Sequence, residues 1–275
     1  MDQQNKTRDA FLEQAIIMHS HALSTSDEFD DDCAIRLCSL WFSNFDHPDD
    51  GLQSSVQSSL QRVQSRKFVF LAHQLSARLS KAESTSRRRG AQQQDTLQSL
   101  IIRMCSEHPY HTLYPVYCLL SDQSHSSGLR RQSSRHDPTS SQTSRSAAAT
   151  DVFQRLLQDP SCKERIEAVK QVCDASLEWA KYPIKGLRRD KSTKVLQIPP
   201  NMRILKLKHP KVPVLTALTA IDPTCRYDGC TWIEGYEDTY DTAGGVNLPK
   251  IVKCIGSDGK KYKQLVSAST SVMVL

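Results

Sequence analysis

The stretch that decides the fold stands near the end of the chain: DTAGGVNLPKIVKCIGSDGKKYKQLV, residues 241–266. Gly244 and Gly245 can adopt positive φ and let the backbone approach a ligand closely. A short apolar run follows, and Gly256-Ser257-Asp258-Gly259 then supplies the Asp-Gly pair that is typical of tight hairpin turns. The sequence therefore predicts a glycine turn, a strand, a hairpin turn and a second strand.

Upstream of residue 180 the chain has the apolar periodicity of amphipathic helices. Short breaks such as His108-Pro109 separate these helices, with no strands between them, which predicts stacked helical hairpins of an α-solenoid. Trp41 and Trp179 lie on apolar faces and are expected in the core, while residues 80–94 are expected to form a loop. The predicted helices cover residues 7–24, 30–42, 52–63, 68–79, 97–105, 113–120, 151–158 and 163–179.

Two other segments have a different character. Residues 121–150 are rich in Ser, Arg and Gln, and we expect them to form a disordered insertion. After Lys181, prolines separate short strand-like runs at 204–208, 214–221 and 231–236. The predicted organisation is helical hairpins in 1–120, the insertion in 121–150, the last helices in 151–183, a linker in 184–203, a β-rich module in 204–266 and a separate tail in 267–275.

The composition excludes several classes of protein. No apolar run is long enough to span a bilayer, and the start of the chain lacks the apolar core of a signal peptide, so a soluble intracellular protein is expected. The net charge of +6 comes largely from loop arginines and from residues 185–194, and it does not favour direct nucleic-acid binding. The nine cysteines lack a Cys-x-x-Cys spacing, and His108 and His111 flank a proline corner, so no metal site is predicted.

The closing stretch resembles a known family. AGGVNLPKI at 243–251 and GSDGKKYKQLV at 256–266 resemble the start of the catalytic domain in the ATM branch of the phosphatidylinositol-3-kinase-related protein kinases. Earlier segments resemble the FAT helices of these kinases in the same order, over roughly residues 30–266. The resemblance implies a mainly α, FAT-like helical-hairpin solenoid followed by a small β-rich partial kinase small lobe. The upstream segments are AIRLCSLWF at 34–42, FVFLAHQLSARL at 68–79, SEHPYHTLYPVYCLL at 106–120, VKQVCDASLEWA at 169–180 and KLKHPKVPVLT at 206–216.

The resemblance also implies a binding site for the phosphates of ATP, with magnesium. Lys250 would contact a phosphate, and the position of the family's ATP-anchoring lysine is occupied by Ser267. The catalytic Asp-Arg-His loop, its Asn and the metal-binding Asp have no counterpart in the chain, so we predict no catalytic residue and no metal ligand. The residues that match the phosphate-covering loop are Gly244, Gly245, Val246, Asn247, Leu248, Pro249 and Lys250.

By the same resemblance, the function would be phosphorylation of Ser/Thr-Gln sites in nuclear DNA-damage checkpoint signalling and telomere maintenance. The partners implied are protein substrates, DNA-damage sensor proteins and a second copy of the kinase. We expect the 275 residues to be inactive alone. The alternatives are a non-catalytic helical scaffold and, less favoured, a basic nucleic-acid binder.

Three short segments carry weaker signals. The tail SASTSVMVL, residues 267–275, stops matching the family abruptly after Val266, and we expect it to be a misplaced reading frame or a read-through intron. Arg135-His136-Asp137 lies in the polar tract, and its likeness to a kinase catalytic loop is interpreted as chance. Ser141-Gln142 is a minimal Ser-Gln phosphorylation site in the same tract.

Overall fold

The structure is a computed structural model of the chain. It describes residues 2–45, 47, 49–80, 88–121, 138–183, 196–243, 249–267 and 273–274. The chain divides into two compact units with a border between Leu156 and Leu157. We call the first the helical unit and the second the sheet unit, and each is described by itself.

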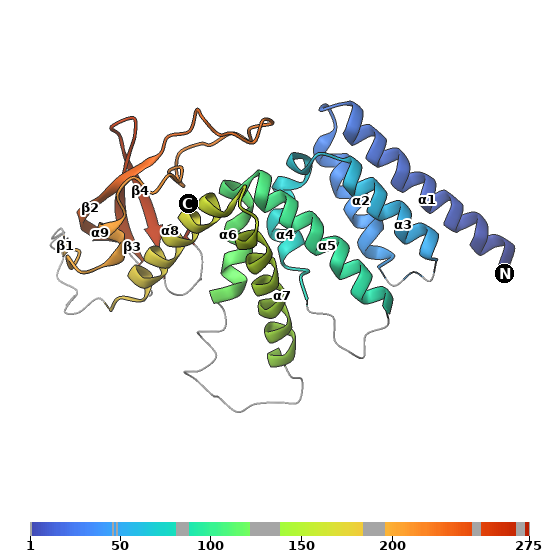
Figure 1. Cartoon of the computed structure of the whole chain (residues 1–275), viewed down its shortest axis with the longest axis horizontal. Helices are drawn as coiled ribbons and strands as arrows, with labels where there is room; N and C mark the ends of the chain where they lie inside the picture. Colours follow the sequence, from blue (N-terminus) through green and yellow to red (C-terminus); the bar gives the residue numbers. More distant parts are fainter. Residues whose placement is uncertain are drawn as a thin grey trace. The chain divides into compact units, whose positions relative to one another are not determined.

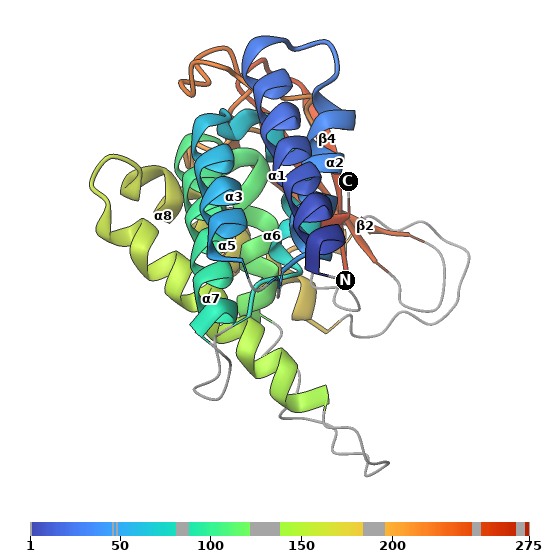
Figure 2. The ribbon, with the colours of Figure 1, turned by 90° about the vertical axis from the view of Figure 1, so that its right-hand side faces the viewer.

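The described part of the helical unit is built from helices. In Figures 1 and 2, α1, α2 and α3 lie side by side, and the contacts of α1 with both other helices agree with this. Further along, α5 packs against α6 and against the short 3₁₀ helix η1. The helices are α1 (Asp2–Thr25), α2 (Asp30–Ser43), α3 (Asp50–Arg62), η1 (Ser65–Leu71), α4 (Ala72–Ser76), α5 (Arg88–Glu107), α6 (Pro109–Ser121) and α7 (Pro138–Gln158).

Helix α2 shows how the sequence pattern produces this packing. Ala34, Leu37, Cys38 and Trp41 recur on one face, and all four are buried. The Trp41 indole N–H donates a hydrogen bond of 2.5 Å to the side-chain oxygen of Gln93 on α5. The prediction that Trp41 belongs to the core is therefore confirmed.

A buried cation connects η1 to the turn between α1 and α2. The Lys67 ammonium donates to the Ser26 carbonyl at 3.0 Å and to Asp30 at 2.5 Å, and it also contacts Asp27. Hydrogen bonds from Lys67, and then from Arg66, hold the pKa of Asp27 below its usual value. Asp30 therefore lies in the first turn of α2 and also forms an ion pair with Lys67.

The helical unit differs from the sequence prediction in three segments. Residues 68–79 form η1 and α4 in place of one α-helix, and α5 begins at Arg88, inside the predicted loop. The disordered insertion predicted for 121–150 is wrong over its second part, because α7 begins at Pro138. Ser146, Ala148 and Ala149 are buried there, so small side chains extend the packed face that Val152, Phe153 and Leu156 form further along α7. Residues 122–137, which include Arg135-His136-Asp137, lie outside the described part of the chain.

The sheet unit packs one long helix, α8 (Lys163–Lys181), with an antiparallel sheet (Figure 1). The strand order follows the chain, β1-β2-β3-β4-β5. The chain is thus mainly helical and then forms a small β-rich region, as predicted. The remaining elements are β1 (Leu196–Gln197), α9 (Arg203–Lys206), β2 (Ile233–Thr242), β3 (Lys250–Gly256), β4 (Lys261–Val266) and β5 (Met273–Val274).

Two of the strands predicted in this region are wrong. Residues 203–206 form the helical turn α9, and residues 214–221 form no strand. Near the second segment, Pro213 makes a single bridge with Trp232 just before β2. The Val214 amide still donates to the Thr231 carbonyl at 2.8 Å, but the Ala217 amide then donates to the Val214 carbonyl at 3.0 Å, so the apolar run turns there in place of continuing as a strand.

Gly256 allows the start of the hairpin turn to pack closely, and its replacement gives a testable prediction. A Cβ at this position would lie 2.7 Å from Asp258 Oδ1 and 2.8 Å from both Thr231 Cγ2 and Tyr262 Cε2. Gly256→Ala is therefore expected to destabilise the sheet unit by about 1–3 kcal/mol, as overpacking does. Hydrogen exchange of β3 and β4 amides across a urea series measures this.

The matched control is Gly229→Ala, because a Cβ there meets no atom within 4 Å. We expect this substitution to leave the stability unchanged within about 0.5 kcal/mol. Equal effects of the two substitutions would contradict the steric explanation.

Candidate functional site

The candidate site is the connection between β2 and β3, which contains the predicted phosphate-covering loop. At its base Thr242 pairs with Lys250, and the Ala243 amide donates to the Pro249 carbonyl at 2.8 Å. Five of the seven predicted loop residues, Gly244–Leu248, lie outside the described residues. The two described ones, Pro249 and Lys250, close the loop and begin β3.

The predicted hairpin turn between β3 and β4 is confirmed. The Gly259 amide donates to the Gly256 carbonyl at 2.9 Å, and Gly259 has a positive φ of 75°. Asp258 accepts hydrogen bonds from the Tyr262 hydroxyl at 2.8 Å and the Lys260 amide at 3.0 Å. The Tyr262 bond is the main reason why the pKa of Asp258 is lowered. A left-handed glycine at this position is the usual way to close such a loop.

The register of the hairpin assigns its residues to two faces. Lys250 pairs with Val266, and Lys250, Val252, Cys254 and Val266 are all buried. Because side chains alternate along a strand, Ile251 and Leu265 lie on the opposite face. Lys250 therefore shares a face with Val266, the last residue of β4, which directly precedes Ser267, the expected position of the family's ATP-anchoring lysine.

The Lys250 ammonium binds the carboxyl end of α8. It donates to the carbonyls of Trp179 at 2.6 Å, Ala180 at 3.1 Å and Tyr182 at 2.5 Å. It also lies 4.6 Å from the centroid of the Trp179 ring. Lys250 is only 3% exposed. An ammonium has three N–H donors, so these bonds use its full capacity.

The charge state of Lys250 fits this arrangement. Burial lowers its pKa to about 8. The ammonium form still predominates at neutral pH, and the three carbonyls and the indole face favour that form. The negative end of the α8 dipole adds to the same effect.

The other face of the hairpin carries an ion-pair cluster. Glu237 on β2 is 3.5 Å from the Lys253 ammonium on β3 and also pairs with Lys261 on β4. The hydrogen bond from Lys261 is the main cause of the lowered pKa of Glu237. The positive charges on this face are thus partly neutralised within the sheet.

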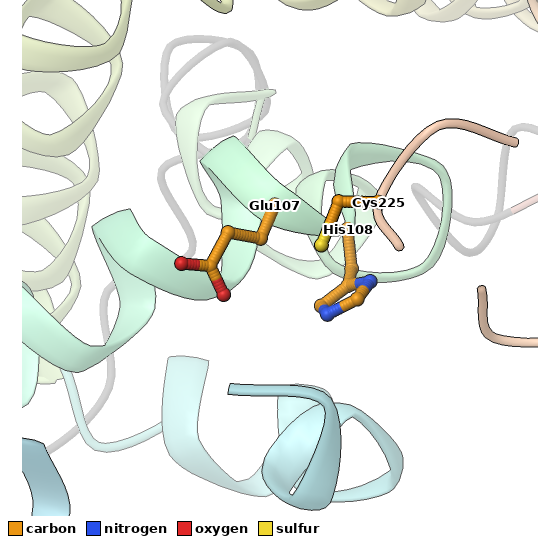
Figure 3. A group of neighbouring side chains, drawn as sticks. All are labelled: Glu107, His108 and Cys225. Atoms are coloured by element: carbon orange, nitrogen blue, oxygen red, sulfur yellow. The ribbon is translucent and has the colours of Figure 1, made fainter. Parts of the chain in front are cut away.

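Three side chains of types that can ligate a metal are drawn in Figure 3: Glu107, His108 and Cys225. Glu107 is the last residue of α5 and His108 follows it in the helical unit, whereas Cys225 belongs to the sheet unit. Glu107 accepts a hydrogen bond from the Ser65 hydroxyl. His108 is buried, and its carbonyl accepts from the Thr112 hydroxyl at 2.7 Å and the Thr112 amide at 3.2 Å. These contacts support the predicted helix corner, and we assign no metal to the group.

Sequence reasoning missed the anchoring of α8 by Lys250. The strand alternation of residues 250–256 already placed Lys250 on the same face as Val252 and Cys254, which was the available signal.

Within the described residues, no helix is both long and apolar enough to cross a membrane.

The comparisons with known proteins agree with the order of helices and hairpin. The chain is 33% identical over 260 residues to the serine/threonine-protein kinase TEL1 of Cryptococcus neoformans, covering 93% of the chain. It is 31% identical over 270 residues to the serine/threonine-protein kinase ATM of Arabidopsis thaliana, covering 95% of the chain. The chain is homologous to the Tel1/ATM serine/threonine kinases. No family model matches it.

Solved structures of Tel1 have the same fold. The open conformation of CtTel1 matches with a TM-score of 0.76 and 26% identity, over 96% of this chain and 9% of that one. The FAT and kinase domain of CtTel1 matches with a TM-score of 0.75 and 25% identity, over 96% of this chain and 17% of that one. The chain spans 8% of the length of the Cryptococcus TEL1 and 6% of the Arabidopsis ATM.

Proposed function

We propose that the chain corresponds to the part of an ATM-like kinase in which the last FAT helices lead into the kinase small lobe. The observation that carries this proposal is the match to the Cryptococcus TEL1 over 93% of the chain, which includes both the helices and the hairpin. The loop Gly244–Lys250 would cover the phosphates of ATP, since glycine-rich loops let backbone amides approach phosphate closely. In this proposal 1–120 and 151–183 are FAT-like, 184–203 is a linker and 204–266 belongs to the small lobe.

The wider function is part of the same proposal. The complete kinase would transfer the γ-phosphate of Mg-ATP to Ser/Thr-Gln sites, act in the nucleus in DNA-damage and telomere signalling, and engage substrates and DNA-damage sensors. A solved relative is a complete CtTel1 dimer with C2 symmetry, which supports a homodimer. ATP and magnesium are the cofactors that kinase relatives imply.

A chimeric kinase tests this proposal. Residues 30–266 would replace the matching segment of the Cryptococcus TEL1, which then supplies its own lysine and catalytic lobe. We expect activity on a Ser-Gln peptide within about tenfold of the parent, since tenfold corresponds to only ~1.4 kcal/mol in the barrier. A folded chimera without activity would instead support the scaffold alternative.

The 275-residue chain alone is expected to show no transfer from Mg-ATP to the same peptide. Phosphoryl transfer depends on metal ions and a base held in position. It also depends on the lysine that anchors ATP, and Ser267 occupies the position expected for that lysine. Radiolabel incorporation, with the chimera as positive control, measures this. Labelling that disappears in the Gly244→Val variant would contradict the prediction.

A further inference from the structure

The contacts of the Lys250 ammonium bear on whether Lys250 can bind phosphate. A side chain that binds phosphate needs free N–H donors directed at the loop. Its three donors are directed at the carbonyls of Trp179, Ala180 and Tyr182. The side chain is buried, and its ammonium meets the end of α8. To contact a phosphate, Lys250 would have to leave three backbone carbonyls without their donor, and each such loss is costly in the interior.

We propose that Lys250 is a positioning residue, which anchors the base of the phosphate-covering loop to the carboxyl end of α8 and does not itself bind phosphate. The proposal rests on the proposed function only for the identity of the ligand that the loop covers. The anchor acts where the loop rejoins the sheet, because Lys250 pairs with Thr242 and directly follows Pro249, the acceptor of the Ala243 amide.

The aromatic surroundings of the anchor are built for a cation. Trp179 stacks on Tyr182 with 5.5 Å between ring centroids, and Tyr240 meets Trp179 edge-on at 4.8 Å. The Lys250 ammonium lies over the faces of both Trp179 and Tyr182. A ring face attracts a cation, and a helix carboxyl end does the same through its carbonyls. A lysine directed at a nucleotide would need neither the aromatic ring faces nor the carbonyls at the helix end.

The first part of the test measures exchange in the complete 275-residue chain. Lys250→Met keeps the length of the side chain and removes the donors. We expect the amides of Tyr182 and Ala243 to exchange about 10- to 100-fold faster. Local opening costs less free energy in the variant, because it no longer has to break the hydrogen bonds of Lys250. The Ile233 amide, which donates to the Val212 carbonyl at 2.9 Å at the far end of β2, should keep its rate. Equal acceleration of all three would show general destabilisation and overturn the positioning role.

Lys260→Met is the matched control, since the Lys260 side chain is 76% exposed beside the hairpin turn. It should leave the exchange of Tyr182 and Ala243 unchanged. An effect as large as that of Lys250→Met would mean that loss of any nearby positive charge is sufficient, and would refute the anchor.

The second part observes the ammonium itself. Heteronuclear NMR of the lysine Nζ groups should show a slowly exchanging signal that Lys250→Met abolishes and Lys260→Met retains. Adding Mg-ATP should leave this signal in place. Absence of the signal, or a saturable shift with Mg-ATP, would overturn the proposal. Both readings are independent of the chimera, so an inactive chimera with an intact signal would refute the proposed function and not the anchor.

Discussion

Replacing Trp179 with alanine is expected to destabilise the sheet unit by about 3–5 kcal/mol, the usual cost of removing a large aromatic side chain from a core. Trp179 is fully buried, and its ring contacts Tyr182, Tyr240 and the Lys250 ammonium. The substitution removes the apolar area of the indole and the ring face that stabilises a buried charge. Urea unfolding followed by hydrogen exchange in β2 and β3 measures the loss.

Two further variants make the Trp179 prediction specific. Trp179→Phe should cost clearly less, because a phenyl ring retains an aromatic face and the buried indole N–H has no acceptor within the described residues. Gln171→Ala, at an exposed position of the same helix, should stay within about 0.5 kcal/mol of the parent. If phenylalanine were as damaging as alanine, the aromatic face would not be the stabilising feature.

The elements predicted best are those whose pattern is local. The stripe of Ile166, Val169, Val172 and Cys173 gave α8, and all four are buried. The Asp-Gly pair gave the hairpin turn because the left-handed conformation of Gly259 is a property of the residue itself. An apolar period predicts a helix, and a turn residue predicts a turn, where residues close in sequence determine the local structure.

The features that were missed depend on partners distant in sequence. The strand predicted at 204–208 is wrong at its start, because residues 203–206 form the helical turn α9. Ile204 is buried there, while Arg203 and Lys206 are exposed. The resemblance implies a phosphate contact for Lys250, and the structure adds that its donors meet carbonyls about 70 positions earlier in the chain. A lysine in a sequence does not show which acceptors the fold will bring to it.

Arg103 gives the second large expected effect, in the helical unit. Its guanidinium caps the carboxyl end of α3 by donating to the carbonyls of Leu60 at 2.8 Å, Gln61 at 2.9 Å and Val63 at 2.8 Å. Burial is the main reason that its pKa is lowered, and Glu107 acts in the opposite direction. Arg103→Met should therefore destabilise the helical unit by about 2–4 kcal/mol, since hydrogen bonds to a charged donor are the strong ones and three are lost together.

The geometry of the cap supplies its own controls. Arg103→Lys retains the charge but not the planar fork, so we expect it to recover only part of the stability. Arg62→Met, in the last turn of α3, should have little effect, because exposed contacts such as that of Arg62 with His21 contribute about 0–1 kcal/mol. Exchange of the Val63 amide, which donates to the Ser59 carbonyl at 3.2 Å, reports on this helix end directly. If Arg103→Lys matched the parent, charge at the helix terminus would be sufficient, and the three-carbonyl cap would not be what stabilises the packing of α3 with α5.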